Sequence, residues 1–172
     1  MTSTATTQRT LAAAAADARL ADARYDEALS WLARTDPTEM DPFGTEVWVF
    51  DEDFTHLLLV QHRWRGLVPP GGGVEHDETP REGAIRELSE ETGLRPELHP
   101  TPVAVTIRSY QSGWAPTLGF TYSAVVPRSS PLTPEPDQPL RWTPLTTTWA
   151  TAFPEDTARA RRYAARLATA RA

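Results

Sequence analysis

A glycine-rich turn followed at once by a carboxylate-rich segment constrains this chain more than any other feature. The stretch reads PPGGGVEHDETPREGAIRELSEETGL and spans residues 69–94. Its two prolines and three consecutive glycines disfavour a helix at the start. Residues 80–92 then fit a helix that begins at Pro80 and ends at Gly93. The stretch therefore predicts either a solvated surface helix with a loose leader or a device that holds metal and phosphate.

Three glutamates share one face of the expected helix. Glu87, Glu90 and Glu91 stand at i, i+3 and i+4, within about 6 Å of one another. Two unit charges at that distance repel by roughly 3 kcal/mol at an effective dielectric near 20, so a cation among them would relieve the repulsion. Oxygen ligands of this kind suit Mg²⁺ or Mn²⁺. On the helix alone, an exposed face neutralised by Arg81 or Arg86 is an equally good interpretation.

The whole stretch resembles the Nudix box, the signature of the Nudix hydrolase family. The box has the spacing G-x5-E-x7-R-E-U-x-E-E-x-G-U, where U is a bulky aliphatic residue. Here it runs from Gly72 to Leu94, and every specified position matches. The strands and helix around the box extend the resemblance to roughly residues 43–170, and residues 1–42 lie outside it.

The resemblance implies a metal centre on this helix. Glu87, Glu90 and Glu91 correspond to the metal ligands of the family, and the carbonyl of Gly71 corresponds to a further ligand. The same three glutamates are the implied catalytic residues. The box does not say which carboxylate acts as the general base.

Other positions of the box are implied to be structural. Glu78 and Arg86 correspond to the pair that braces the loop against the helix, and Leu88 belongs to the core. Some members of the family place an extra acid in a late loop, where this chain has Glu135 and Asp137. A solvated loop is the alternative for both.

The implied activity is hydrolysis of a nucleoside diphosphate linked to a moiety X, with Mg²⁺ or Mn²⁺ as the cofactor. The substrate and the protein are both anionic, because the net charge of the chain is −6. A metal ion would neutralise the phosphate oxygens and lower the pKa of the attacking water, and a glutamate would take its proton. The alternative is a Nudix-fold ligand-binding or regulatory module without turnover, although such modules tend to lose the box glutamates that this chain keeps.

Substrate binding is expected from residues outside the box. Arginines can hold phosphate at two points, and exposed aromatic rings can stack on a base. Each of these residues has a plain alternative, as a surface arginine or as a core aromatic. The candidates are Arg63, Trp64, Arg65, Arg108 and Trp114, with His62, Tyr110 and Phe120 as weaker ones.

The order of elements predicts an α/β fold. Strands are expected at 45–51, 55–62, 101–110, 117–126 and 140–143, and a last helix begins near residue 153. Such a mixed sheet with helices differs from strict βαβ alternation. With the resemblance, it implies a Nudix-type α/β/α sandwich with a mixed sheet, plus an N-terminal helical extension. The Nudix domain is expected at residues 43–170.

Residues 1–42 are predicted to form a tail, an alanine-rich helix over 9–34 and a linker. The helix packs on its own domain or serves as a dimerisation or partner helix. Its expected apolar stripe comprises Leu11, Ala15, Ala18, Ala21, Tyr25, Leu29 and Leu32.

Composition excludes several functions. The chain has no cysteine, which removes disulfides and thiolate catalysis and argues against the isoprenoid isomerase branch of the family. All 17 basic residues are arginine, so Schiff-base chemistry is excluded. No stretch approaches the ~20 apolar residues of a membrane helix, and the acidic surface is unsuited to nucleic acid. We expect a cytoplasmic protein with a small-molecule substrate, either monomeric or a homodimer.

Overall fold

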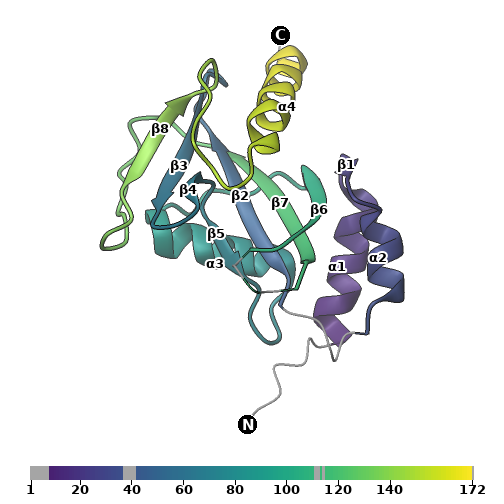
Figure 1. Ribbon diagram of the computed structural model, residues 1–172. Helices are drawn as coiled ribbons and strands as arrows, with labels where there is room; N and C mark the ends of the chain where they lie inside the picture. Colours follow the sequence, from purple (N-terminus) through teal and green to yellow (C-terminus); the bar gives the residue numbers. More distant parts are fainter. Residues whose placement is uncertain (1–7, 37–41, 111–112, 114, 172) are drawn as a thin grey trace. The chain divides into compact units, whose positions relative to one another are not determined.

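The computed structural model describes residues 8–36, 42–110, 113 and 115–171 (Figure 1). Within these residues it has four helices and a mixed sheet of eight strands, which confirms the predicted α/β class. The helices are α1 (Gln8–Leu20), α2 (Ala28–Arg34), α3 (Pro80–Thr92) and α4 (Glu155–Arg171). The strands are β1 (Ala23–Arg24), β2 (Gly44–Phe50), β3 (His56–His62), β4 (Gly66–Val68), β5 (Gly71–Gly73), β6 (Ala104–Arg108), β7 (Thr117–Val125) and β8 (Leu140–Pro144).

The strand order is β1-β6-β7-β2-β3-β4, with β5 beside β2 and β8 beside β3. The described pairing of β1 with β6 is parallel, whereas β3 pairs antiparallel with β2, β4 and β8. None of the helices in the described part of the chain is long and apolar enough to cross a membrane.

The chain forms two compact units, each built from three stretches of sequence. The first unit comprises the described residues of 1–46, 71–87 and 99–122. The second unit comprises those of 47–70, 88–98 and 123–172. The domain boundary expected at residue 42 stays a prediction.

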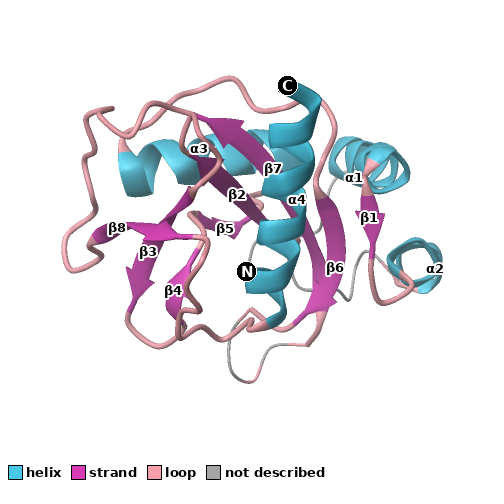
Figure 2. Ribbon diagram, turned by 90° about the horizontal axis from the view of Figure 1, so that it is seen from above, coloured by secondary structure: helices cyan, strands magenta, loops and turns pink. Residues whose placement is uncertain are grey.

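In the first unit, the N-terminal segment is not the single helix predicted for residues 9–34. It forms α1, the short strand β1 and α2, with β1 beside β6 (Figure 2). Three backbone N–H groups between Asp22 and Tyr25 donate to carbonyls of residues 102–105 at 2.9–3.1 Å. Asp26 and Glu27 then take positive φ angles of 56° and 55°. Pairing with the sheet thus overrides the helix propensity of this alanine-rich segment.

The predicted apolar stripe is correct only in part. Ala18 and Ala21 are buried as expected, whereas Leu29 of α2 is exposed, and α1 also buries Thr10 and Ala14. The buried face of α1 lies within its own unit, which favours packing on the chain over a partner helix.

Backbone pairing fixes the glycine triplet of the first unit. Residues 71–73 pair antiparallel with residues 44–46 of β2. Thr45 donates its hydroxyl to the carbonyl of Pro80 at 3.0 Å, so its side chain points toward the start of α3. Successive side chains of a strand alternate between faces, so Glu46 points to the opposite face of the sheet.

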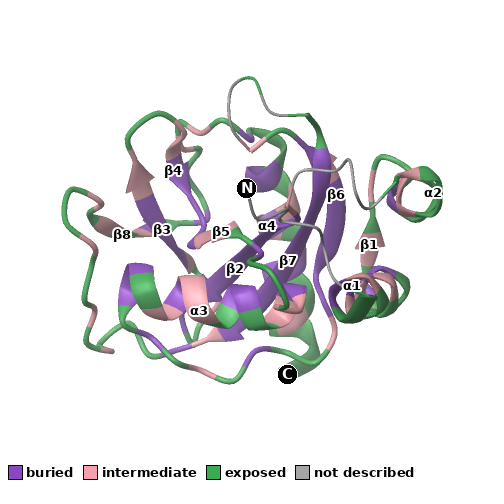
Figure 3. Cartoon of the chain, turned by 90° about the horizontal axis from the view of Figure 1, so that it is seen from below, coloured by how far each residue is buried: buried purple, intermediate pink, exposed green. Residues whose placement is uncertain are grey.

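The second unit has an aromatic core. Trp48 is fully buried, and the centre of its ring lies 6.2 Å from that of Tyr163 of α4 in an edge-to-face arrangement. Phe50 lies against the same tyrosine at 5.9 Å. Trp142 of β8 is only partly buried. The purple segments of Figure 3 show how much of β2 and β3 is buried.

Candidate active site

The glycine turn lies directly against the first glutamate of the cluster. A Cβ placed on Gly72 would overlap the carboxylate of Glu87, whereas a Cβ on Gly73 would meet nothing within 4 Å. The absence of a side chain at residue 72 therefore lets β5 approach α3 at the position of a candidate metal ligand.

Arg86 joins the loop, the turn and the helix. Its Nε and Nη2 donate to the two carboxylate oxygens of Glu78 at 2.8 and 3.0 Å. Nη2 also donates to the carbonyl of Gly73 at 2.8 Å, and Nη1 donates to Oε1 of Glu87 at 2.8 Å. The predicted contact between Glu78 and Arg86 is present, and its role as a brace stays a prediction.

Electrostatics follow from this network. The hydrogen bond from Arg86 lowers the pKa of Glu78 below its ordinary value, although partial burial opposes the shift. In turn, the hydrogen bond to Glu78 raises the pKa of Arg86. Glu78 is thus held as a carboxylate, and it also accepts the N–H of Glu75 at 3.0 Å.

A capping box begins α3. The N–H of Thr79 donates to Oε2 of Glu82 at 2.8 Å, and the N–H of Glu82 donates to the hydroxyl of Thr79 at 3.2 Å. The predicted start of the helix at Pro80 is correct. Glu82 was not among the predicted site residues, although the pattern T-x-x-E is itself a known helix-start signal.

The remaining glutamates follow on the same helix. α3 continues to Thr92, so Glu90 and Glu91 stand at i+3 and i+4 from Glu87. Glu90 is exposed and Glu91 is buried. Leu88 is buried as expected, and Ala84 and Thr92 are buried too, whereas Ile85 is exposed. Gly93 ends the helix with a φ of 75° and an N–H bonded to the carbonyl of Ser89.

The carboxylate oxygens of Glu87, Glu90 and Glu91 are donors that suit a hard cation. Within the described ranges 8–36, 42–110, 113 and 115–171, no group of three or more His, Asp or Glu side chains is gathered to hold a metal ion. Glu87 is instead engaged by Arg86.

The predicted substrate residues around Trp64 form a surface turn of the second unit. The Trp64 side chain is 79% exposed, and the guanidinium of Arg63 lies 5.4 Å from its ring centre. The N–H groups of Trp64 and Arg65 donate to Nδ1 of His62 at 3.2 Å. Burial, and secondly the charge of Arg65, lower the pKa of His62 below its ordinary value.

Arg108 belongs to a polar face of the sheet in the first unit. It is buried, and it stands opposite Thr117 in the antiparallel register of β6 and β7. Thr121 lies on the same face and donates to the buried carboxylate of Glu46 at 2.9 Å. Glu46 was not predicted, although an acid inside the apolar run EVWVF is a recognisable signal.

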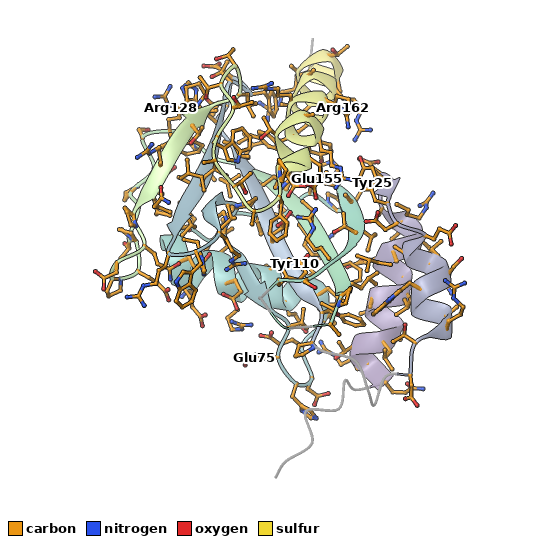
Figure 4. The ribbon with its side chains drawn as sticks, in the orientation of Figure 1. Tyr25, Glu75, Tyr110, Arg128, Glu155 and Arg162 are labelled. Carbon is orange, nitrogen blue, oxygen red and sulfur yellow. The ribbon has the colours of Figure 1, made fainter. Side chains whose placement is uncertain are left out.

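Tyr110 covers part of this polar face. Its ring lies against Gly44 of β2 and Gly119 of β7, where a Cβ on either glycine would overlap it (Figure 4). Phe120 is fully buried in the core against Phe43, which excludes it from stacking on a ligand. Trp114 lies outside the described residues.

The late-loop acids are engaged locally or exposed. Glu135 accepts a hydrogen bond from the amide of Gln138 at 2.8 Å. Asp137 is exposed and has a φ of 64°. A solvated loop describes both residues.

The family model for the NUDIX domain matches residues 40–167, which is most of the chain. The chain belongs to the Nudix family. The complete box from Gly72 to Leu94 therefore lies inside a Nudix domain, and α1, β1 and α2 lie before the matched region.

Curated relatives match this Nudix chain over short segments. It is 47% identical over 49 residues to a putative 8-oxo-dGTP diphosphatase of Bacillus subtilis, covering 28% of this chain and 31% of that protein. It is 57% identical over 37 residues to an RNA pyrophosphohydrolase of Shewanella sediminis, covering 22% of this chain and 20% of that protein. The matches thus span about a third or less of these relatives.

Solved structures share the Nudix fold over nearly their whole length. A C. elegans Ap4A hydrolase in a binary complex has a TM-score of 0.62 at 19% identity, covering 75% of this chain and 99% of that chain. A NUDIX-family hydrolase from Clostridium perfringens has a TM-score of 0.60 at 20% identity, covering 73% and 97%. At these identities the likeness establishes the fold alone.

Proposed function

We propose that this protein is a Mg²⁺- or Mn²⁺-dependent Nudix hydrolase that cleaves a diphosphate linkage in a nucleoside diphosphate linked to another moiety. One observation carries the proposal. Within the box, Gly72 lies against the Glu87 carboxylate, while Arg86 donates hydrogen bonds to both Glu87 and Glu78.

The residues present fit a hard divalent cation. Glu87, Glu90 and Glu91 together with the carbonyl of Gly71 supply only oxygen donors, which Mg²⁺ and Mn²⁺ prefer. When bound, the cation neutralises phosphate oxygens and lowers the pKa of the attacking water. A carboxylate of α3 accepts the proton of that water. The hydrogen bond from Arg86 to Glu87 restricts the rotation of the Glu87 side chain.

The names of two curated relatives, a putative 8-oxo-dGTP diphosphatase and an RNA pyrophosphohydrolase, support a substrate with linked phosphates. The exposed Trp64 offers a stacking surface for a base, and Arg63 and Arg65 offer positive charge for phosphate. Arg108 and Trp114 are the further binding candidates.

A panel of nucleotides tests the proposal. Nucleoside triphosphates, oxidised nucleotides, nucleotide sugars and dinucleoside polyphosphates are incubated with Mg²⁺, and release of phosphate, pyrophosphate or a nucleoside monophosphate is measured. We expect turnover that EDTA abolishes and added Mg²⁺ restores.

Matched variants test the assigned roles. Glu90→Gln and Glu91→Gln keep the shape of the side chain and remove its charge, so we expect at least about a 100-fold loss of kcat. Glu97→Gln changes an exposed glutamate outside the box and serves as the control. Full activity in both box variants would refute the assignment, and ligand binding without any product would favour the module without turnover.

A further inference from the structure

The N-terminal helix α1 is hydrogen-bonded to the loop that precedes α3. Arg9 donates from Nη1 and Nη2 to the two carboxylate oxygens of Glu82 at 2.8 and 2.5 Å, and also to the carbonyl of Asp77. The hydroxyl of Thr10 donates to the carbonyl of Glu78 at 2.7 Å. Two consecutive residues of α1 therefore contact the loop at its backbone and at the capping residue of α3.

The two contacts differ in strength. The side chains of Arg9 and Glu82 are 53% and 48% exposed, so solvent screens this pair and it contributes little alone. Thr10 is only 2% exposed. Removal of its hydroxyl would leave the Glu78 carbonyl with an unmade hydrogen bond in a partly buried place, which is the more costly loss.

Other contacts hold α1 to the rest of its unit. The hydroxyl of Tyr122 in β7 donates to Asp17 at 2.5 Å. The guanidinium of Arg81 in α3 lies 4.7 Å from the ring centre of the same tyrosine. Beyond α1, the backbone of β1 is hydrogen-bonded to β6. The helix is thus fixed at several points, so it can restrain the loop rather than follow it.

The contact between α1 and the loop matters because the loop includes Glu78. The residue whose carbonyl Thr10 binds, Glu78, is the one whose carboxylate receives Arg86. Arg86 in turn donates to Glu87. A continuous chain of described hydrogen bonds therefore runs from α1 through Glu78 and Arg86 to a proposed metal ligand.

We propose that α1 is a positioning element of the Nudix site, in which Thr10 and Arg9 hold residues 77–82 so that Glu78 and Arg86 keep Glu87 in place. This inference rests on the proposed function. Neither residue belongs to the region that matches the family, which begins at residue 40.

Point variants in the full chain test the proposal. Thr10→Val keeps the shape and loses the hydroxyl, Thr10→Ser keeps the hydroxyl, and Arg9→Ala removes the guanidinium. Arg19→Ala, which changes an exposed arginine of the same helix, is the control. Amide hydrogen exchange of residues 75–82 reports on the loop without requiring activity, and kcat and KM report on the site.

We expect Thr10→Val to raise exchange in the loop about 3- to 10-fold and to lower kcat by a similar factor with little change in KM, because a lost hydrogen bond weakens local structure to that extent. Arg9→Ala should do the same more weakly. Thr10→Ser should restore most of both readouts, and Arg19→Ala should match the parent chain.

Two outcomes would overturn the inference: unchanged exchange in Thr10→Val, or faster exchange with an unchanged kcat. If the parent chain hydrolyses nothing on the panel, the proposed function fails separately. In that case the Mn²⁺ affinity of the same variants, measured by electron paramagnetic resonance, decides. A lower affinity in Thr10→Val supports a positioning role, and an unchanged affinity rejects it.

Discussion

At the scale of single residues, neighbouring glycines of the turn have different reasons to be glycine. Gly72 lies against the Glu87 carboxylate, whereas Gly73 has open space where a side chain would begin. At residue 72 a side chain would overlap Glu87, so glycine is required for steric reasons. At residue 73 no such steric requirement exists.

Gly72→Ala should impair catalysis far more than Gly73→Ala. A methyl group at residue 72 must displace Glu87, and a shift of about 1 Å in a catalytic group can lower the rate roughly 100-fold. We expect a fall of about 10- to 100-fold in kcat for Gly72→Ala and nearly parental kinetics for Gly73→Ala, both measured with Mg²⁺. Equal kinetics in the two variants would show that contact with Glu87 is unimportant.

Glu78 should give the folded state a pH-dependent stabilisation. Arg86 lowers its pKa below the ordinary value of 4.5. The stabilisation is therefore complete above about pH 4.5 and is lost as the pH falls through the lower folded-state pKa. The side chains of Glu78 and Arg86 are only 20% and 22% exposed, so solvent screens their interaction little. We therefore expect Glu78→Gln to lose about 1 kcal/mol of unfolding free energy at pH 7.

Urea unfolding between pH 3 and pH 7 measures this effect. The difference between the parent chain and Glu78→Gln should shrink toward pH 3, while Glu97→Gln should show little difference at any pH. A deficit in Glu78→Gln that is constant with pH would mean that packing, and not charge, is responsible.

Whether a residue could be predicted depended on the kind of signal that it gives in the sequence. Glu87, Glu90 and Glu91 were proposed as site residues because a fixed spacing along one helix is visible in the sequence. Glu46 and Glu82 were not, because their partners Thr121 and Arg9 are 75 and 73 residues away and the contacts exist only in the folded chain. The sequence therefore shows the spacing of the box, but not the contacts that Glu46 and Glu82 make across the fold.

At the scale of elements, the ends of α3 are defined by two different devices. A reciprocal capping box fixes its start, and a glycine with left-handed backbone follows its last residue. Both devices were readable in part from the sequence, which is why the predicted bounds of 80 and 92 match the helix closely.

Gly93→Ala should destabilise the protein without touching the carboxylates. An alanine would adopt a φ of 75° at a cost, and its Cβ would lie only 3.0 Å from the side chain of Thr133. We expect a loss of about 1–2 kcal/mol in unfolding free energy. Thermal unfolding by circular dichroism measures it, with Gly73→Ala as the control. No loss would indicate that the end of α3 tolerates a shift.

Elements that depend on a distant partner were the ones missed. β1 interrupts the predicted N-terminal helix because carbonyls of residues 102–105 accept its N–H groups. β5 consists of glycines, which have low strand propensity, and exists through pairing with β2. Local propensity carries no information about either interaction.

At the scale of the whole molecule, residues before the family match are part of a compact unit. Ala14, Ala18, Ala21 and Ala28 are buried, and β1 covers an edge of β6. Removal of this segment would expose apolar surface and an unpaired strand edge. The cytoplasmic location and the homodimer both stay predictions.

A chain that begins at residue 43 should therefore be less stable and should tend to aggregate. We expect a clearly lower melting temperature and a larger apparent size by light scattering, whereas a chain that begins at Gln8 should match the parent. An equally stable shortened chain that changes from a dimer to a monomer would instead identify α1 as a dimerisation helix.

The sequence segments of the two units alternate along the chain, which has a consequence for protein engineering. Each unit draws on three separate stretches, and β2, β7 and α3 each pass from one unit into the other. No contiguous gene fragment encodes either unit alone. Neither unit can therefore be moved to another gene as one continuous segment, or exchanged by a single recombination crossover. A cut between residues 47 and 122 would divide both units between the two fragments, because each unit has residues on both sides of it.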